Sequence, residues 1–266
     1  DPDAVARGLR EAVASGRVTE SRIEQSARKI LAAKYDLGLV SRRVTPLEEI
    51  DAAVMSPDAV KLTDEVAERA VTLVRDDARL LQRENGTGLR PGARVFNLAV
   101  TNGDDRLAIA NSNPFVTQLA RLGVRADMVV LDSRSTEQEI RDALERAQKA
   151  DVVVASLYVR VRSGAVNSGS MPEQGARVLN TLLEKKVPVV GISFGNPYLL
   201  KDFKGLQTYV VAYGDMASLQ RAAARAILGR SDFTGRLPIT LPDLYPRGTG
   251  IQLKATPAAP AAVTGR

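Results

Sequence analysis

Apolar residues along the chain fall into short, nearly unbroken runs, separated by segments whose apolar positions recur every three or four residues. Unbroken Val/Ile/Leu runs are typical of parallel strands covered on both faces, and the spaced positions are typical of amphipathic helices. Their regular alternation predicts an α/β fold with a doubly wound, mostly parallel sheet and right-handed crossovers. The predicted strands span residues 94–100, 127–132, 151–159, 187–194 and 208–213.

Helix signals fill the spaces between these runs. The pair Asn113-Pro114 opens a helix that ends near Gly123, and Thr136 with Glu139 forms a capping box at the start of another helix. Further helices are predicted over residues 172–185, 197–203 and 216–228.

The capping residues and apolar spacing of the first 38 residues predict two helices. Asp1 and Pro2 suit the start of the first helix, and Gly16 interrupts its apolar stripe. Thr19 suits the cap of the second helix, which ends at Gly38. A helical N-terminal segment therefore precedes the alternating part of the chain.

The segments before and after these five predicted strands carry further strand and turn signals. A helix from residue 56 leads to two short predicted strands, VTLVRD (71–76) and RLLQR (79–83), around a turn at Asp76-Asp77. Near the other end, Gly235 predicts a turn and RLPIT (236–240) an edge strand, whose prolines stop the sheet from growing. The predicted organisation is a helical segment (1–40), a linker with a helix and leading strands (41–92), the α/β sandwich (93–250) and a Pro/Ala-rich tail (251–266).

Composition excludes several kinds of chemistry. The 266 residues include no histidine and no cysteine, which excludes Ser-His-Asp hydrolysis, Cys-His proteolysis and histidine-ligated zinc within this chain. We expect no metal site and no cofactor. No apolar run is long enough to span a membrane. The net charge of +6 comes with scattered arginines and only 4% aromatic residues, so the pattern does not indicate a nucleic-acid-binding surface.

The loops that follow the predicted strands are the expected ligand-binding positions, because ligands of such sheets lie outside the carboxyl ends of the strands. The longest of them spans residues 159–171. Its two guanidinium groups suit hydroxyls, carbonyls or carboxylates, and its amide and hydroxyl groups suit a sugar. The candidate substrate-binding residues are Arg160, Arg162, Asn167, Ser168 and Ser170. A solvated loop without a ligand fits the composition equally well, and both interpretations stay open.

Three other features favour structural roles. The loop TNGDD (101–105) lacks the glycine and lysine fingerprints of phosphate loops, so a nucleotide-binding Rossmann-like domain is a remote alternative. Glu173 begins a predicted helix, where the helix dipole favours its anion, which suits a helix start better than a general acid. Asn196 precedes a proline and must be extended, which predicts that its side chain caps or bridges backbone groups.

Taken in order, several motifs resemble glycoside hydrolase family 3. The segment from VARGLREAVASG to KYDLGLV (5–40) is similar to the end of that family's barrel domain, and AERAVTLVRDDARLLQ (67–82) to the passage into its second domain. RVFNLAV, DVVVAS, MPEQ and PVVGISFGNPY match the following elements in order. AILGRSDFTGRLPITLP (226–242) resembles the family's most specific signature.

The resemblance implies that the chain is the C-terminal α/β sandwich domain with the last helices of a truncated TIM barrel at residues 1–40. In the family the nucleophilic aspartate lies in the barrel, so the resemblance places no catalytic residue in this chain. The β-glucosidase branch takes its acid/base glutamate from a loop like residues 158–171, but this loop has no acidic residue. The chain therefore looks more like the β-N-acetylhexosaminidase branch, whose His/Asp acid/base dyad lies in the barrel.

On this resemblance the expected partners are the N-terminal barrel of the same protein and a carbohydrate substrate, with this chain alone inactive. The β-glucosidase branch and a catalytically dead carbohydrate-binding or scaffold module remain alternatives. The composition leaves the compartment open, and a periplasmic or secreted location is compatible with it.

Overall fold

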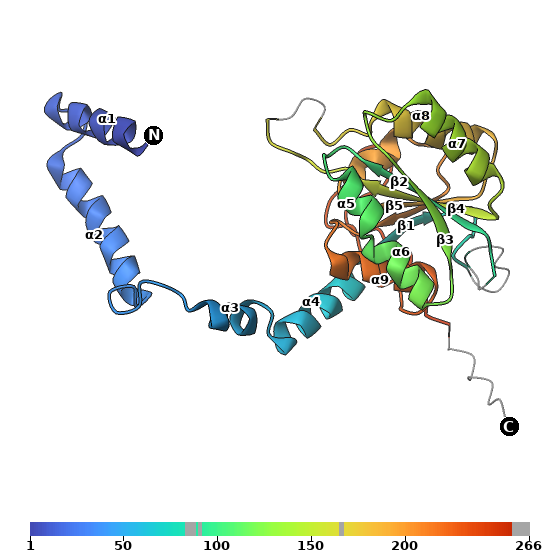
Figure 1. Cartoon of the computed structure of the whole chain (residues 1–266), viewed down its shortest axis with the longest axis horizontal. Helices are drawn as coiled ribbons and strands as arrows, with labels where there is room; N and C mark the ends of the chain where they lie inside the picture. Colours follow the sequence, from blue (N-terminus) through green and yellow to red (C-terminus); the bar gives the residue numbers. More distant parts are fainter. Residues whose placement is uncertain (83–88, 90–91, 165–167, 257–266) are drawn as a thin grey trace, which may run out of the picture. The chain divides into compact units, whose positions relative to one another are not determined.

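A computed structural model describes residues 1–82, 89, 92–164 and 168–256 (Figure 1). The chain divides into two compact units, Asp1–Val60 and Lys61–Arg266. The second unit contains the six-stranded sheet and carries the candidate site. Its strands are β1 (Thr72–Asp76), β2 (Val95–Thr101), β3 (Ala126–Leu131), β4 (Val152–Tyr158), β5 (Val189–Ser193) and β6 (Thr208–Val211).

The sheet has the strand order β1-β6-β5-β4-β2-β3, in which β2 to β6 are parallel and β1 pairs antiparallel with β6. From β2 the chain winds one way to β3 and the other way through β4, β5 and β6. The winding direction therefore reverses at β2 and β4, where doubly wound folds form a crevice at the carboxyl ends of the strands.

Helices cover both faces of the sheet (Figure 1). They are α5 (Arg106–Asn111), α6 (Pro114–Arg121), α7 (Glu137–Gln148), α8 (Glu173–Glu184), the 3₁₀ helix η1 (Pro197–Lys201) and α9 (Ala217–Ile227). Side chains of β2 alternate between the two faces: Val95 and Ala99 pack in one core cluster, and Phe96 and Leu98 pack in the other. Residues of α6 and α9 complete the first cluster, and residues of α7 and α8 complete the second. Both faces of the sheet are buried, which explains the unbroken apolar runs.

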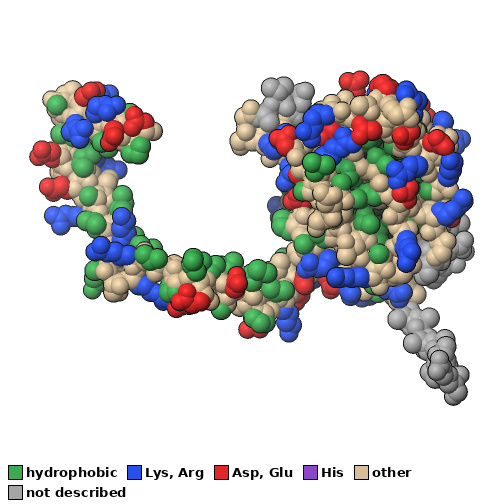
Figure 2. All heavy atoms as spheres, in the orientation of Figure 1, with side chains coloured by type: hydrophobic (Ala, Val, Ile, Leu, Met, Phe, Trp, Pro, Cys, Tyr) green, Lys and Arg blue, Asp and Glu red, His purple; other side chains and the backbone are tan. Residues whose placement is uncertain are grey.

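The first unit consists of helices that expose their apolar stripes. They are α1 (Pro2–Ala14), α2 (Glu20–Asp36), α3 (Leu47–Val54) and the first residues of α4 (Pro57–Ala70). Within residues 1–60, all of which the structure describes, only Ala12 is buried. Figure 2 shows hydrophobic side chains at the surface of these helices. Leu9, Ile30 and Leu31 are exposed by 47, 58 and 63%, so this unit has an apolar surface without a covering layer.

The doubly wound, mostly parallel sheet is confirmed, and each of the five strands predicted between residues 94 and 213 matches a strand of the structure. The predicted capping box is also present: Glu139 N donates to Thr136 Oγ1, and Thr136 N donates to Glu139 Oε2 at 2.8 Å. Helix α5 was not predicted, because its six residues are too few to show a helical period.

Two predicted strands are wrong. Residues 79–82 of RLLQR form no strand, because Leu80 N and Leu81 N donate to the Asp76 carboxylate at 3.0 and 3.3 Å and fold the chain into a turn. RLPIT also forms no strand: Leu237 N donates to Thr249 O, so its backbone bonds locally rather than to the sheet. The segment after it, at Ile251, makes an isolated bridge with β1.

Candidate functional site

The candidate site lies at the carboxyl ends of β2, β4 and β6, around the side chain of Arg160. This residue follows β4 by two positions, and its Nη1 lies 3.0 Å from a carboxylate oxygen of Asp215, beyond β6. Its Nη2 donates to Asp105, which lies beyond β2. We call this arrangement the Arg160 bridge; it consists of Arg160, Asp105 and Asp215. A single guanidinium therefore connects three loops of the edge where ligands of this fold bind.

The backbone of Arg160 is held as firmly as its side chain. Asn102 Oδ1 accepts from Arg160 N at 3.0 Å, and Asn102 Nδ2 donates to Arg160 O at 2.9 Å. Gly103 fits beneath the guanidinium, since a Cβ at this position would lie 3.1 Å from Arg160 Nη2. The polar loop TNGDD is thus an internal support for the loop after β4.

The far end of residues 159–171 is fixed from the β5 side. Asn196 N donates to Val159 O at 2.7 Å, and Asn196 Nδ2 donates to Gly169 O at 2.7 Å. Gly195 permits this approach, because a Cβ there would lie 2.1 Å from Val159 O. Asn196 Oδ1 also accepts from Tyr198 N at 2.9 Å. The predicted role of Asn196 in capping and bridging backbone groups is confirmed.

Next to the bridge, the buried hydroxyl of Tyr158 makes hydrogen bonds inside the core. The Tyr158 hydroxyl accepts from Asn113 Nδ2 at 3.1 Å and donates to Gln220 Oε1 at 3.0 Å. Gln220 Nε2 in turn donates to Asp215 O at 2.6 Å. The Tyr158 ring stacks on Phe194 with centroids 5.0 Å apart. Burial raises the pKa of Tyr158 far above its ordinary value, so this phenol stays neutral and acts as a structural group.

Some of the candidate substrate-binding residues are bound to other side chains of the domain, and others are exposed to solvent. The guanidinium of Arg160 is occupied by the two carboxylates of the bridge. Arg162 is more open: its side chain is 43% exposed and donates from Nη2 to Asn102 O at 2.6 Å. Ser168 Oγ accepts from Arg162 N, and Ser170 is exposed. Asn167 lies outside the described residues.

Sequence reasoning missed the partners of the bridge. Asp105 and Asp215 are separated from Arg160 by 55 residues each, and only the sheet order brings all three together. One signal was available: Gln220 is a polar residue on the apolar face of the alanine-rich helix α9, and it is buried. A polar residue at such a position requires a hydrogen-bond partner inside the protein.

The end of β3 carries a second charged cluster at the same edge. Asp132 is buried, and burial alone would raise its pKa, but hydrogen bonds from Arg134 and the charge of Arg106 hold that pKa below its ordinary value. Arg106 also pairs with Glu139. These carboxylates are compensated by guanidinium groups, which suits structural ion pairs rather than a general acid.

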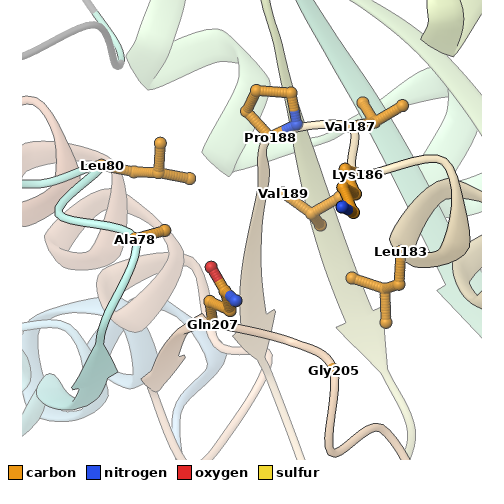
Figure 3. A pocket seen from close by; sticks show the side chains of 9 residues that line it. All are labelled: Ala78, Leu80, Leu183, Lys186, Val187, Pro188, Val189, Gly205 and Gln207. Atoms are coloured by element: carbon orange, nitrogen blue, oxygen red, sulfur yellow. The ribbon is translucent and has the colours of Figure 1, made fainter.

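A cavity of about 400 Å³ lies at the opposite, amino-terminal edge of the sheet, where residues just before β5 and β6 line it (Figure 3). Lys186 is the charged lining residue and Gln207 adds an amide; the rest of the described lining is apolar or glycine. No lining residue that the structure describes carries a carboxylate.

Across the residues that the structure describes, no group of three or more acidic, histidine or cysteine side chains is placed to hold a metal ion. Within that same part of the chain, no helix has the length and apolar character needed to cross a membrane.

Comparison with known proteins identifies relatives over nearly the whole chain. Residues 14–259 match the glycosyl hydrolase family 3 C-terminal domain. A beta-N-acetylglucosaminidase/beta-glucosidase of Cellulomonas fimi is 26% identical over 247 residues, covering 87% of this chain and 41% of the relative. A lysosomal beta glucosidase of Dictyostelium discoideum is 27% identical, covering 91% of this chain and 32% of the relative. The chain thus spans less than half the length of these relatives.

Solved structures share the fold. A family 3 beta-N-acetylglucosaminidase from Paenibacillus sp. superposes with a TM-score of 0.66 at 22% identity, covering 87% of this chain and 41% of that protein. A beta-glucoside phosphorylase superposes with a TM-score of 0.63 at 24% identity, covering 88% and 41%.

Proposed function

The chain belongs to glycosyl hydrolase family 3, as its C-terminal domain, and from this premise we propose that it is the non-catalytic second domain of an enzyme that hydrolyses β-N-acetylhexosaminides. The substrate class is an N-acetylglucosamine-containing glycan, such as a cell-wall sugar. The parent reaction is retaining hydrolysis, with the carboxylate nucleophile on the barrel that precedes this domain.

The observation that carries this proposal is the chemistry of the loop after β4. Residues 159–171 contain two arginines and no acidic residue. Among the described carboxylates near the base of the loop, Asp105 and Asp215 are both bound to Arg160, and Asp104 lies beside Arg162 with its side chain 93% exposed. A general acid needs a proton to give and access to the glycosidic oxygen; Asp105 and Asp215 are not free for that task, and Asp104 lies in solvent beside a guanidinium. In this proposal the acid therefore comes from the barrel.

The proposed partner is that N-terminal barrel, and the first unit supports it. Helices α1 and α2 border an open groove of about 580 Å³, lined in part by Leu9, Val13 and Ile23. Helices that expose apolar stripes gain stability by packing on another layer, at about 25 cal/mol per Å² of apolar surface removed from water. The last helices of a barrel would have such exposed stripes when the rest of the barrel is absent.

In the proposed enzyme, the loop after β4 reaches the edge of the substrate site. Arg162 and Ser170 are two of its exposed polar groups among the described residues, and they suit the hydroxyl and amide oxygens of an N-acetylated sugar. Asn167 and Ser168 belong to the same proposed set, while Arg160 supports the loop from below. The contribution of this domain is substrate binding, and the bond-breaking chemistry belongs to the barrel.

The test compares two substrates on the full-length protein. We expect kcat/KM for an aryl β-N-acetylglucosaminide to exceed that for the matched aryl β-glucoside by at least tenfold, and we expect the isolated chain to turn over neither substrate. A preference for the glucoside would overturn the assignment of substrate. Turnover by the isolated chain that survives repurification would overturn the non-catalytic role.

Two alternatives remain for the parent protein. The relatives named as beta-glucosidases favour a glucosidase, for which the aryl β-glucoside would be the better substrate. A full-length protein that binds glycans but turns over neither substrate would instead be a carbohydrate-binding module on an inactive barrel.

A further inference from the structure

The described ends of residues 159–171 meet at Arg160. At the outgoing end, Arg160 N and O both bond to the side chain of Asn102. At the returning end, Gly169 N donates to Arg160 O at 3.2 Å. The backbone of Arg160 is therefore the point where the two ends of the loop meet.

The Arg160 side chain extends this base to the neighbouring loops. The two ion pairs of the bridge connect the loops after β2 and β6, which are not adjacent, since β4 and β5 lie between them in the sheet. Asn196 adds the loop after β5 through its bond to Val159 O. Four loops at the carboxyl edge thus meet at two successive residues, Val159 and Arg160.

We propose that Arg160 is a positioning residue, which sets the geometry of the loop after β4 by bridging Asp105 and Asp215 rather than by touching the sugar. The expected effect on substrate rests on the proposed function. The two ion pairs of the bridge are independent of it. The side chain of Arg160 is 38% exposed, so the two ion pairs matter less for their energy than for the fixed planar fork that spans two carboxylates.

The same geometry predicts that a lysine at this position would not reproduce the bridge. An ammonium group is a compact charge on a flexible stem and cannot bond two separated carboxylates in one fixed plane. We expect Arg160→Lys to keep the fold and the charge but to lose one of the two ion pairs, so that the ends of the loop after β4 are held less firmly. Arg160→Met removes the charge as well, and we expect it to lose both ion pairs, so that the ends of the loop are held least firmly.

The experiment measures amide hydrogen exchange and kinetics on the full-length enzyme. In Arg160→Met the amides of Gly169 and Asn196 should exchange at least tenfold faster, and in Arg160→Lys at least threefold faster. Amides of β2 should be unchanged, which shows that the fold is intact. The matched control is Arg134→Lys, an arginine that pairs with Asp132 at the same edge but bonds to no described residue of the loop. Unchanged exchange at Gly169 in both Arg160 variants would overturn the bridge.

Kinetics separate this inference from the proposed function. With a natural oligosaccharide, Arg160→Lys should raise KM about tenfold and leave kcat within twofold, because a misplaced binding loop loses ground-state and transition-state binding together. A fall in kcat at constant KM would overturn a positioning role for binding. Faster exchange with unchanged KM and kcat would support the bridge and instead overturn the proposed contact between the loop and the substrate.

Discussion

At Gly235 the backbone runs so close to the start of β1 that no side chain fits. A Cβ there would lie 2.4 Å from Thr72 Oγ1, and 2.5 and 2.6 Å from the carbonyl oxygens of Ala70 and Val71. Two of these atoms belong to the backbone and cannot move without disturbing the strand. The sequence suggested Gly235 as a turn residue; in the structure, a glycine is needed here because the backbone lies against residues 70–72.

Gly235→Ala should therefore destabilise the α/β unit by about 3 kcal/mol, the upper end of the cost of overpacking. Chemical denaturation followed by circular dichroism would measure this change. Gly205→Ala is the control, because its Cβ would meet only side-chain atoms of Leu183 at 3.8 Å, an ordinary contact distance. Equal stability of the two variants would contradict the steric explanation.

Glu139 provides a pH-dependent test at the residue scale. The backbone N–H of Thr136 and then the guanidinium of Arg106 hold its pKa below the ordinary value of 4.5. The unfolded chain therefore binds the proton more tightly, so the stabilisation is present above that ordinary value and is lost as the pH falls through the folded pKa.

We expect Glu139→Gln to lower the free energy of unfolding by about 0.5 to 1 kcal/mol at pH 7, a small value because the side chain is 36% exposed. The difference from the parent chain should shrink as the pH falls below 4.5 and vanish in stronger acid. Unfolding curves at pH 7 and pH 3.5 would check this. A difference of equal size at both pH values would show that charge is not its source.

At the scale of elements, the strands were predictable because both faces of the sheet are covered. Val152, Val153 and Val154 are all fully buried, so every position of β4 had to be apolar whichever face it met. RLPIT alternates as an edge strand does, but its bonding partner is the segment around Thr249, which the apolar pattern does not specify. Periodicity reports burial and does not identify the partner of a backbone N–H.

The candidate site was predictable in position and not in detail. Topology alone places residues 159–171 at the carboxyl edge of the sheet. The ion pairs at the base of that loop depend on which loops lie near one another, and this follows from the strand order of the sheet. No local sequence pattern indicates that strand order. For this reason Arg160 and Arg162 looked equivalent in the sequence, although only Arg160 bridges Asp105 and Asp215.

The proposed role of the loop gives a prediction for Arg162. Loss of one charge-assisted hydrogen bond costs about 1.5 to 3 kcal/mol, so Arg162→Ala in the full-length enzyme should lower kcat/KM on a natural oligosaccharide about ten- to a hundredfold. Arg121→Ala, at the exposed end of α6, is the control. Parental kinetics in both variants would leave the loop without a contact to the substrate.

At the scale of the whole molecule, the two units differ in how they bury apolar surface. The α/β unit has two buried core clusters, whereas residues 1–60 bury a single alanine. The helices of the first unit therefore depend on a partner for most of their stability.

Limited proteolysis should detect this dependence. In the isolated chain we expect the earliest cuts, outside the C-terminal tail, near Gly16 and Ser41, between the helices of the first unit. In the full-length protein, which would supply the proposed barrel, these sites should be cut at least tenfold more slowly. Protection of both sites in a monomeric isolated chain would show that the helices need no barrel.

The antiparallel strand β1 has a consequence for synthesis. Its partner β6 follows far along the chain, since Thr208, which bonds to Asp76, comes 132 residues later. A ribosome adding about 5 to 20 residues per second would leave β1 unpaired for about 7 to 26 seconds. During that interval the nascent chain carries an apolar strand whose backbone edges are unpaired, directly after the helices that would pack on the proposed barrel. Early docking of those helices would hold β1 apart from other nascent chains until its own partner emerges.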